Sequence, residues 1–158
     1  MSLNQAMTMV FVNKKDTAHD MQKKLKARSI EAKVLTSNLD HAERDKLMDD
    51  FRRLKFTTLI STNVLARGID VPEVDLVISL DVPFVVEQGC WKEPDYANYM
   101  HRVGRTGRFG TDGISVQVTC HEDEINMMEK IKRHYDIEIN QLSNFNELVD
   151  TFKQLRDV

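Results

Sequence analysis

The apolar run MTMVFV, residues 7–12, is the segment that decides the fold class of this chain. A strand that is apolar on both faces is typical of a parallel sheet covered on both sides, because a solvated face would need alternating polar residues. Two similar runs follow, TTLIS at residues 57–61 and VDLVISL at residues 74–80, and amphipathic stretches separate them. The sequence therefore predicts an α/β fold with a mostly parallel central sheet flanked by helices.

The segments around these runs predict the remaining elements. Helices are expected at residues 17–28, 40–53, 96–105 and 123–135 and from Asn146, and further strands at residues 32–35 and 114–119 and near Ile137. Asp16 is the expected N-cap of the first helix, and Asp40 with Glu43 predicts a capping box for the second. The stretch PFVVEQGCWKEP, residues 83–94, is too irregular for a helix or strand and is interpreted as an exposed loop.

Length and composition limit the class of protein. The 158 residues suit one domain, and we expect residues 1–6 to be a tag or linker remnant and residues 7–158 to form that domain. No apolar run is long enough to span a bilayer, so no membrane role is expected. A net charge of −3 argues against coating nucleic acid by bulk electrostatics, so a polyanion would need a local basic patch. Cys90 and Cys120 show no metal-ligand spacing and are expected to be free thiols, with no metal site.

The octapeptide HRVGRTGR, residues 101–108, places four basic side chains and two glycines together. Arginine suits phosphate because its planar, permanently charged fork offers several fixed donors, and glycine allows close backbone approach. If the segment is helical, His101, Arg105 and Arg108 share one face. The alternative interpretation is a solvated, basic helix end.

A second polar segment, STNVLARGID at residues 61–70, leaves the predicted strand at residues 57–61. Ligands of open α/β sheets gather at the carboxyl ends of the strands. Thr62 could donate to a phosphate there, and Asp70 could accept from a ribose hydroxyl. An ordinary capped turn is the alternative, just as Lys14 and Lys15 after the first strand could be a solvated charge pair.

Together, TNVLARGID and HRVGRTGR resemble the fifth and sixth conserved motifs of DEAD-box RNA helicases, which lie in the second RecA-like lobe. The second motif matches residue for residue. The resemblance extends to the strand at residues 9–12, to Glu43-Arg44 and to residues 77–83. It implies a RecA-like three-layer sandwich, and it implies that the chain is the helicase C-terminal domain of an ATP-dependent RNA helicase.

The resemblance also implies roles for single residues. Arg105 and Arg108 match the arginine fingers that reach the γ-phosphate of ATP in the transition state. The other implied sites are ATP binding by Gly68 and Asp70, contact between lobes by Arg67, His101 and Arg102, and RNA binding by Thr62, Arg44, Ser37, Asn13 and Lys14.

The chain departs from the family pattern in three places. Thr36-Ser37 replaces a His-Gly or similar small pair, His41 stands where a glutamine is usual, and Lys14 occupies an expected threonine position. These departures bear on how the chain would hold RNA.

Two other family features are missing from the sequence. There is no GxxxxGK[ST] loop to hold phosphates and no Asp-Glu-Ala-Asp for magnesium. ATP and Mg²⁺ would therefore be held mainly by an N-terminal lobe that precedes Met7, and this chain alone is expected not to hydrolyse ATP.

The segment at residues 84–100 and the ending at residues 127–139 are similar to the DEAD-box branch that acts in mRNA export at the nuclear pore. This likeness implies remodelling of RNA-protein complexes, in cytoplasm and nucleus, by a monomer whose partners are RNA, its own N-terminal lobe and an export activator with inositol hexakisphosphate.

Two alternatives remain. One is a catalytically silent protein-docking or RNA-binding module derived from this lobe. The other is a DNA-acting translocase, although such relatives commonly have glutamine in place of His101.

Overall fold

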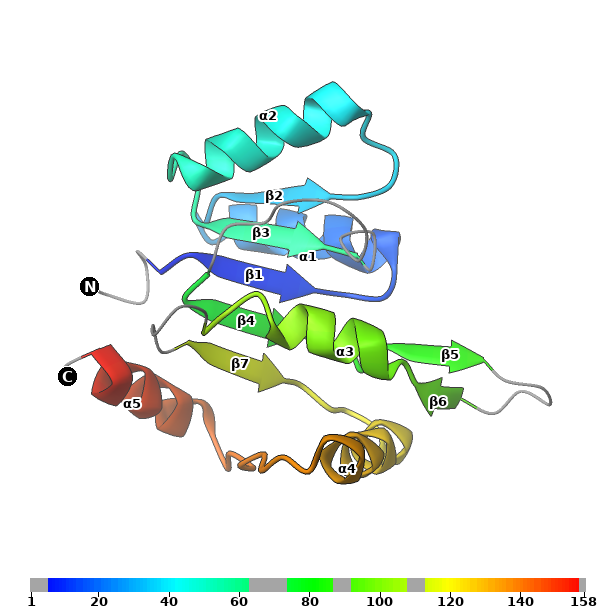
Figure 1. The fold of residues 1–158 in the computed structure, drawn as a ribbon. Coiled ribbons are helices and arrows are strands. Elements are labelled where there is room, and N and C mark those ends of the chain that lie inside the picture. Colours follow the sequence, from blue (N-terminus) through cyan, green and yellow to red (C-terminus); the bar gives the residue numbers. More distant parts are fainter. Residues whose placement is uncertain (1–5, 63–73, 87–91, 108–112, 157–158) are drawn as a thin grey trace.

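The structure is a computed structural model, and it describes residues 6–62, 74–86, 92–107 and 113–156. Five parallel strands form the central sheet in the order β2-β3-β1-β4-β7 (Figure 1). Their bounds are β1 Thr8–Phe11, β2 Ala32–Leu35, β3 Thr58–Ser61, β4 Leu76–Ser79 and β7 Ile114–Gln117. The predicted parallel sheet is confirmed, and MTMVFV supplies its central strand.

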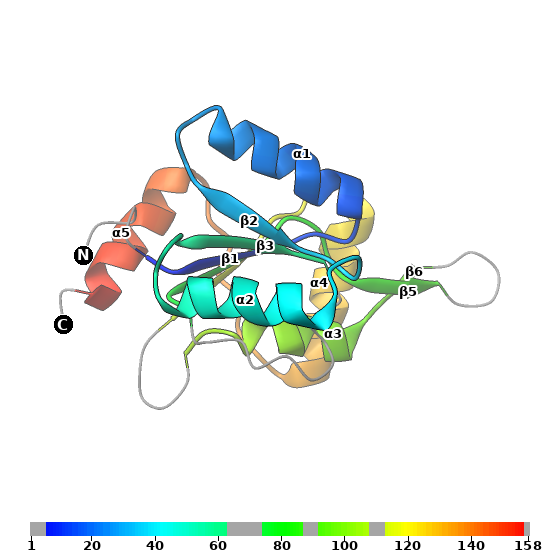
Figure 2. The ribbon, with the colours of Figure 1, turned by 90° about the horizontal axis from the view of Figure 1, so that it is seen from above.

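Helices cover both faces of the sheet and give three layers (Figure 2). The helices are α1 Lys15–Lys26, α2 His41–Arg52, α3 Tyr96–Val103, α4 Glu122–Tyr135 and α5 Phe145–Arg156. Figure 2 shows α1 and α5 on one face and α2 and α3 on the other. The predicted three-layer α/β sandwich is therefore confirmed.

Strand β1 and the residue after it bury side chains on both faces, as its composition predicts. Met9 and Phe11 pack in the cluster that includes α2, whereas Val10 and Val12 pack in the cluster that includes α1. All four are at most 3% exposed. Fully burying an apolar side chain of this size contributes about 1.5–3 kcal/mol, so β1 is a major source of stability.

The last helix closes the sheet beside β4 and β7. Phe152 of α5 packs with Leu76 and with Ala6, which is also buried. The division of the chain between residues 6 and 7 stays a prediction. In the described part of the chain, no helix combines the length and the apolar character that crossing a bilayer requires.

The expectation of a loop at residues 83–94 is wrong. The chain there forms an antiparallel hairpin from β5, Phe84–Val86, and β6, Lys92–Pro94. The Lys92 ammonium lies 5.0 Å from the centre of the Phe84 ring, and Glu93 forms an ion pair with Lys130 of α4 at 2.6 Å. These contacts of charged residues stabilise a hairpin whose sequence lacks the alternation by which strands are recognised.

The predicted start of α2 is confirmed and that of α1 is wrong. Asp40 accepts from the Glu43 N–H at 2.8 Å, and the Glu43 carboxylate accepts from the Asp40 N–H at 2.9 Å. In α1 the N-cap is Lys14, which makes no side-chain cap bond, because the helix begins two residues earlier than expected. Asp16 lies in the first turn, where its charge still complements the helix dipole.

The strand predicted near Ile137 is also wrong. Residues 137–142 pair with no strand in the described part of the chain. Ile139 instead packs against the cluster formed by α3 and α4. An apolar residue in an extended link can bury its side chain without a partner strand, so the pattern alone misleads here.

The end of α3 is attached to the beginning of β4 and β7. The Val74 N–H donates to the Arg105 carbonyl at 3.1 Å. Gly113, just before β7, lies so close to the end of HRVGRTGR that a Cβ there would sit 1.7 Å from Thr106 Oγ1 and 2.7 Å from the Gly107 nitrogen. The absence of a side chain at Gly113 therefore allows this segment to lie against the sheet.

We expect Gly113→Ala to destabilise the domain, because the new methyl group would push Thr106 and Gly107 from their positions. Overpacking of this kind costs about 1–3 kcal/mol. Thermal denaturation of the variant measures the loss. Ser115→Ala, at an exposed position of β7, is the matched control and should leave the melting temperature nearly unchanged. A Gly113→Ala variant as stable as wild type would show that the close approach is not required.

Candidate functional site

Four parallel strands end in register at one edge of the sheet. Phe11 at the end of β1 is paired with Ser61 of β3 and Ser79 of β4, and Ser61 is paired with Leu35 of β2. The polar residues that follow these strands are Asn13 and Lys14 after β1, Thr36 and Ser37 after β2, Thr62 after β3, and Asp81 after β4. The register thus places four of the five predicted RNA-binding residues along one edge.

Contacts between strand exits bring the fifth residue to the same edge. Arg44 of α2 donates from Nη2 to the Ser37 carbonyl at 3.0 Å. Lys15 reaches from the β1 exit to Asn38 Oδ1 at 2.8 Å. Ser37 and Lys14 are exposed and Arg44 is half-buried. These side chains form a basic, accessible edge.

Thr62 and Thr36 are buried, unlike the exposed Ser37 and Lys14. Thr62 is the predicted phosphate contact of the two. Its N–H donates to the Leu35 carbonyl at 3.4 Å, which holds the β3 exit against β2. Its Oγ1 is buried and has no hydrogen-bond partner among the described residues. An unsatisfied buried hydroxyl costs about 1–3 kcal/mol. The predicted phosphate contact would supply a partner, and it stays a prediction.

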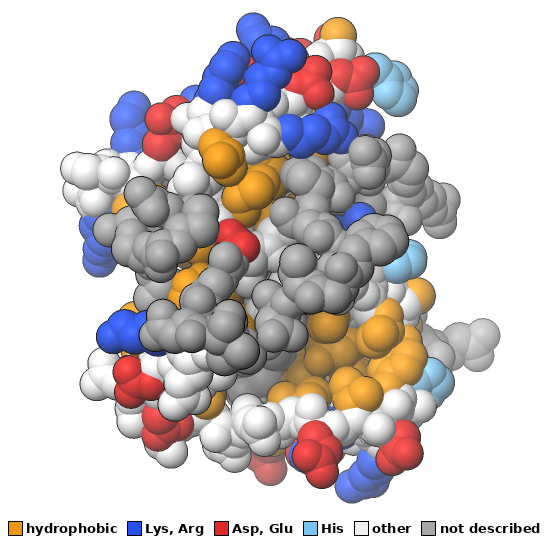
Figure 3. Space-filling view, turned by 60° about the vertical axis from the view of Figure 1, so that its left-hand side comes forward, with side chains coloured by type: hydrophobic (Ala, Val, Ile, Leu, Met, Phe, Trp, Pro, Cys, Tyr) orange, Lys and Arg blue, Asp and Glu red, His pale blue; other side chains and the backbone are white. Residues whose placement is uncertain are grey.

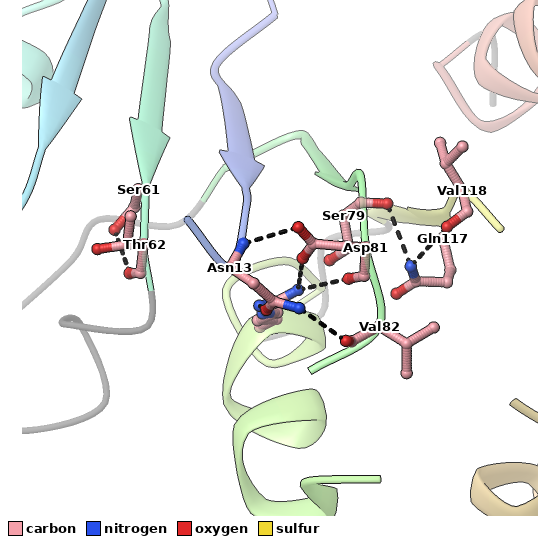
Figure 4. A network of polar contacts seen from close by, with 9 residues as sticks. Asn13, Ser61, Thr62, Ser79, Asp81, Val82, Gln117 and Val118 are labelled. Atoms are coloured by element: carbon pink, nitrogen blue, oxygen red, sulfur yellow. Dashed lines mark hydrogen bonds and ion pairs between the residues drawn. The ribbon is translucent and has the colours of Figure 1, made fainter. Parts of the chain in front are cut away.

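Asn13, Asp81 and Arg102 form a hydrogen-bonded network at the exits of β1 and β4. Figure 4 shows Asn13 and Asp81 facing one another across these exits. Asp81 Oδ2 accepts from the Asn13 N–H at 2.7 Å. Arg102, which is 2% exposed, donates to the Asp81 carbonyl at 2.8 Å and to Asn13 Oδ1 at 2.7 Å. The amide of Asn13 also donates to the Val82 carbonyl at 2.9 Å. The polar atoms of the Asn13 side chain therefore all have partners inside the lobe.

Burial governs the pKa of both charged groups in this network. Desolvation raises the pKa of Asp81, although the Asn13 N–H and the Arg102 charge act in the opposite direction. Desolvation likewise lowers the pKa of Arg102, against the favourable charge of Asp81. Both shifts mean that the ionised forms lose more by leaving water than their partners return. The ion pair, 3.5 Å between Nη1 and Oδ1, is therefore not a simple stabilising contact.

The expected arginine stripe on one helical face is not formed. Helix α3 ends at Val103 with Gly104 as its C-cap, so Arg105 lies beyond the helix. Arg105 still returns to the last turn, because its Nε donates to the His101 carbonyl at 3.0 Å. His101 is exposed and Arg105 is half-buried. The glycine ends the helix earlier than the periodicity of the charges implies.

Four predicted site residues, Arg67, Gly68, Asp70 and Arg108, lie outside the described residues. Arg105 is near the start of β4, whereas the predicted RNA-binding residues are at the strand ends (Figure 1). Helix α3 lies beside the ends of the strands and carries Arg102 near its C-terminal end, and the segment that follows it leads back to the start of β4 (Figure 1).

The surface carries charges of both signs. In Figure 3, Lys and Arg side chains gather at the top of the molecule with Asp and Glu side chains among them. This mixture fits the net charge of −3 and favours a local site over a broad basic face. Within the described ranges, no cluster of three or more His, Cys, Asp or Glu side chains could hold a metal ion.

Comparison with known proteins assigns the family. Residues 1–110 match the helicase conserved C-terminal domain. The chain belongs to this family. The helicase lobe is 40% identical over 151 residues to the ATP-dependent RNA helicase DBP5 of Candida glabrata, a match that covers 94% of this chain and 29% of the relative. It thus spans less than a third of that relative's length.

Solved structures agree with this assignment and confirm the resemblance to DEAD-box proteins of the Dbp5 type. The C-terminal domain of the DEAD-box protein Dbp5 has a TM-score of 0.85 at 35% identity, covering 96% of the lobe and 84% of that domain. Saccharomyces cerevisiae Dbp5 bound to RNA and ADP BeF3 has a TM-score of 0.84 at 36% identity, covering 96% of the lobe and 38% of that chain. A Dbp5 variant of the same yeast, bound to a Gle1 variant and IP6, has a TM-score of 0.83 at 35% identity, covering 97% of the lobe and 39% of that chain.

Asp81 and Gly113 carry no predicted role in the sequence, yet the structure places both beside predicted site residues. The signal for Asp81 was a carboxylate directly after an apolar strand, at the edge where ligands gather. Gly113 had no comparable signal, because its close contacts are with Thr106 and Gly107, which are not its neighbours in the sequence.

We expect Arg102→Ala to destabilise the lobe strongly. The substitution would leave Asp81 without its charged partner and Asn13 Oδ1 without its donor, and removing one member of a buried pair costs about 3–5 kcal/mol. Urea denaturation measures the loss. Arg133→Ala, at an exposed position of α4, should change the free energy of unfolding by no more than about 0.5 kcal/mol. Equal stability of the two variants would contradict a central role for Arg102.

The stability of wild type relative to Asp81→Asn should depend on pH. Because folding raises the pKa of Asp81 above its ordinary value of 3.8, folded wild type retains a proton that the unfolded chain releases in the window between those two values. The unfolding free energy of wild type relative to the variant should therefore fall as pH rises through this window and level off above it. Urea denaturation at a series of acidic to neutral pH values checks the sign, and a difference that rises with pH would refute it.

Proposed function

We propose that this lobe is the second half of an RNA-stimulated ATPase, an ATP-dependent RNA helicase whose first lobe holds ATP and Mg²⁺. One observation carries the proposal: the register of β1, β2 and β3 aligns Asn13, Ser37 and Thr62, residues of three separate segments, along one edge. A row of this kind suits the regularly spaced phosphates of a nucleic-acid backbone.

RNA binding would be independent of sequence. Lys14 and Arg44 would supply charge, and Thr62 and Ser37 would supply hydroxyl groups. The side chain of Asn13 has partners within the lobe, so its part would be to hold the backbone that presents Lys14. Binding of Lys and Arg to phosphates releases counterions from the RNA, and this release is less favourable when the bulk salt concentration is high, so RNA affinity should fall with ionic strength.

ATP hydrolysis would depend on residues at and after the C-terminal end of α3 and on residues that follow β3. Arg105 and Arg108 would approach the γ-phosphate when the lobes close, and Gly68 and Asp70 would approach the nucleotide. Arg67 and His101 would contact the first lobe, and Arg102 would hold the internal network. The bond from Arg105 Nε to the His101 carbonyl restrains the guanidinium before ATP arrives. A preorganised charge of this type stabilises a transition state without reorganising solvent.

The cellular role would be remodelling of RNA-protein complexes in mRNA export, in cytoplasm and nucleus and at the nuclear pore. The similarity to yeast Dbp5 structures that contain RNA, or Gle1 and IP6, supports RNA and an export activator with inositol hexakisphosphate as partners. The protein would act as a monomer whose two lobes close on ATP and RNA.

In the full-length protein, Arg108→Ala and Arg105→Ala should each reduce RNA-stimulated ATP hydrolysis by about 10³-fold to 10⁵-fold, because the transition-state charge loses a finger. Steady-state phosphate release with saturating single-stranded RNA measures the effect. Arg133→Ala is the matched control and should retain full activity.

ATPase activity that survives Arg108→Ala would refute the finger assignment and favour a catalytically silent module. Parallel assays with single-stranded DNA separate an RNA helicase from a DNA translocase, because only the translocase should be stimulated by DNA to the same degree.

A further inference from the structure

We propose that Asp81 is a positioning residue that couples RNA contact at the β1 exit to the placement of Arg105 at the end of α3. The proposal rests on the proposed function, since it assumes that Lys14 contacts RNA and that Arg105 acts on ATP. Asp81 itself would touch neither ligand. Its role would be to hold two backbone segments in a fixed relation.

The first link joins Asp81 to the predicted RNA contact. Its Oδ2 accepts from the Asn13 N–H at 2.7 Å. This bond fixes the peptide between Val12 and Asn13, and so the direction in which the chain leaves β1. Lys14 is the next residue and is exposed. A shift of Lys14 on binding a phosphate would therefore act on the Asp81 carboxylate through one peptide unit.

The second link joins Asp81 to α3. The Arg102 guanidinium donates to the Asp81 carbonyl at 2.8 Å and to Asn13 Oδ1 at 2.7 Å, and the side chain is 2% exposed. A planar guanidinium with fixed donors tolerates little rotation at a buried site. Movement of the β1 or β4 exit would therefore displace the last turn of α3 or break these bonds.

The third link joins Arg102 to Arg105. The Arg105 N–H donates to the Arg102 carbonyl at 3.2 Å, and the Arg105 carbonyl accepts from the Val74 N–H at 3.1 Å. Nε of Arg105 is bonded to the His101 carbonyl, one residue before Arg102. The predicted finger is thus attached to the same helical turn that the network holds.

The energetics favour a geometric role for this network over a stabilising one. Burial raises the pKa of Asp81 and lowers that of Arg102, so desolvation offsets part of what the ionised pair contributes to the fold. Apolar residues could fill the same space, but they could not orient the Asn13 peptide and the Arg102 fork at once.

The test compares Asp81→Asn with wild type in the full-length protein. Three quantities are measured: ATP hydrolysis without RNA, hydrolysis with saturating oligouridine, and the Kd for fluorescein-labelled oligouridine. We expect RNA-stimulated kcat to fall about tenfold, a typical size for coupling between two sites. RNA-free hydrolysis and the Kd should change by less than about twofold, because the groups that contact ligands remain. Asp123→Asn, an identical change at an exposed position of α4, should leave all three unchanged.

A merely structural role gives a different pattern. The rates of ATP hydrolysis with and without RNA would fall by the same factor, and the melting temperature would fall as well. That result would overturn the proposal. If Asp81→Asn is unfolded at the assay temperature, Asp81→Glu replaces it, since it keeps the charge but moves the carboxylate by one methylene, and the same selective loss is expected.

A double-mutant cycle with Lys14→Ala tests the direction of coupling. If Asp81 transmits the effect of Lys14, the loss of stimulated kcat caused by Lys14→Ala should nearly disappear in the Asp81→Asn background. Losses that multiply would overturn the proposal. Arg108→Ala distinguishes failure of the proposed function from failure of the coupling. If ATP hydrolysis survives Arg108→Ala, the proposed function is refuted. If Arg108→Ala abolishes hydrolysis but RNA stimulates Asp81→Asn as fully as wild type, only the coupling is refuted.

Discussion

The buried guanidinium of Arg102 constrains the arrangement around it. Arginine keeps its charge in proteins, so a side chain that is 2% exposed must be surrounded by acceptors. The carbonyl of Asp81 accepts from Nη1 and the amide oxygen of Asn13 accepts from Nη2, and they come from the exits of two strands that are neighbours in the sheet. The requirement fixes how α3 lies relative to β1 and β4, and with it where the chain leaves the helix toward Arg105.

This arrangement relates two regions that the chain separates. The strand exits present polar and basic side chains at one edge of the sheet, while Arg105 is attached to the start of β4 by the Val74 N–H. The C-terminal end of α3 and the segment that follows it connect the two regions (Figure 1). A two-lobe enzyme that responds to RNA by hydrolysing ATP needs such a relation within each lobe, because the two ligands occupy different parts of the cleft. In the proposed function, the network would supply this relation through the bonds of Arg102 to Asp81 and Asn13.

Local sequence rules succeeded where the local interaction dominates and failed where distant contacts decide. The capping box at Asp40 and Glu43 involves residues three apart, and it forms as expected. The hairpin of β5 and β6 forms an ion pair with Lys130 of a later helix, and the exposed-loop interpretation missed this hairpin. The early end of α3 at Val103 moved Arg105 off the helical face that its spacing implied. The motifs still identified the family, since they record residue types and not the exact end of a helix.

The sequence by itself determined the class of the fold and the chemical groups of the site. Apolar strands that alternate with amphipathic helices require a covered parallel sheet, because their side chains must leave water on both faces. Clustered arginines and glycines indicate phosphate by their chemistry alone. Only the tertiary structure decided which side chains are accessible: it buried Arg102 and engaged Asn13, left Lys14 exposed, and gave Asp81 its place between them. Those outcomes depend on hydrogen bonds between residues up to 89 positions apart, and no local pattern encodes them.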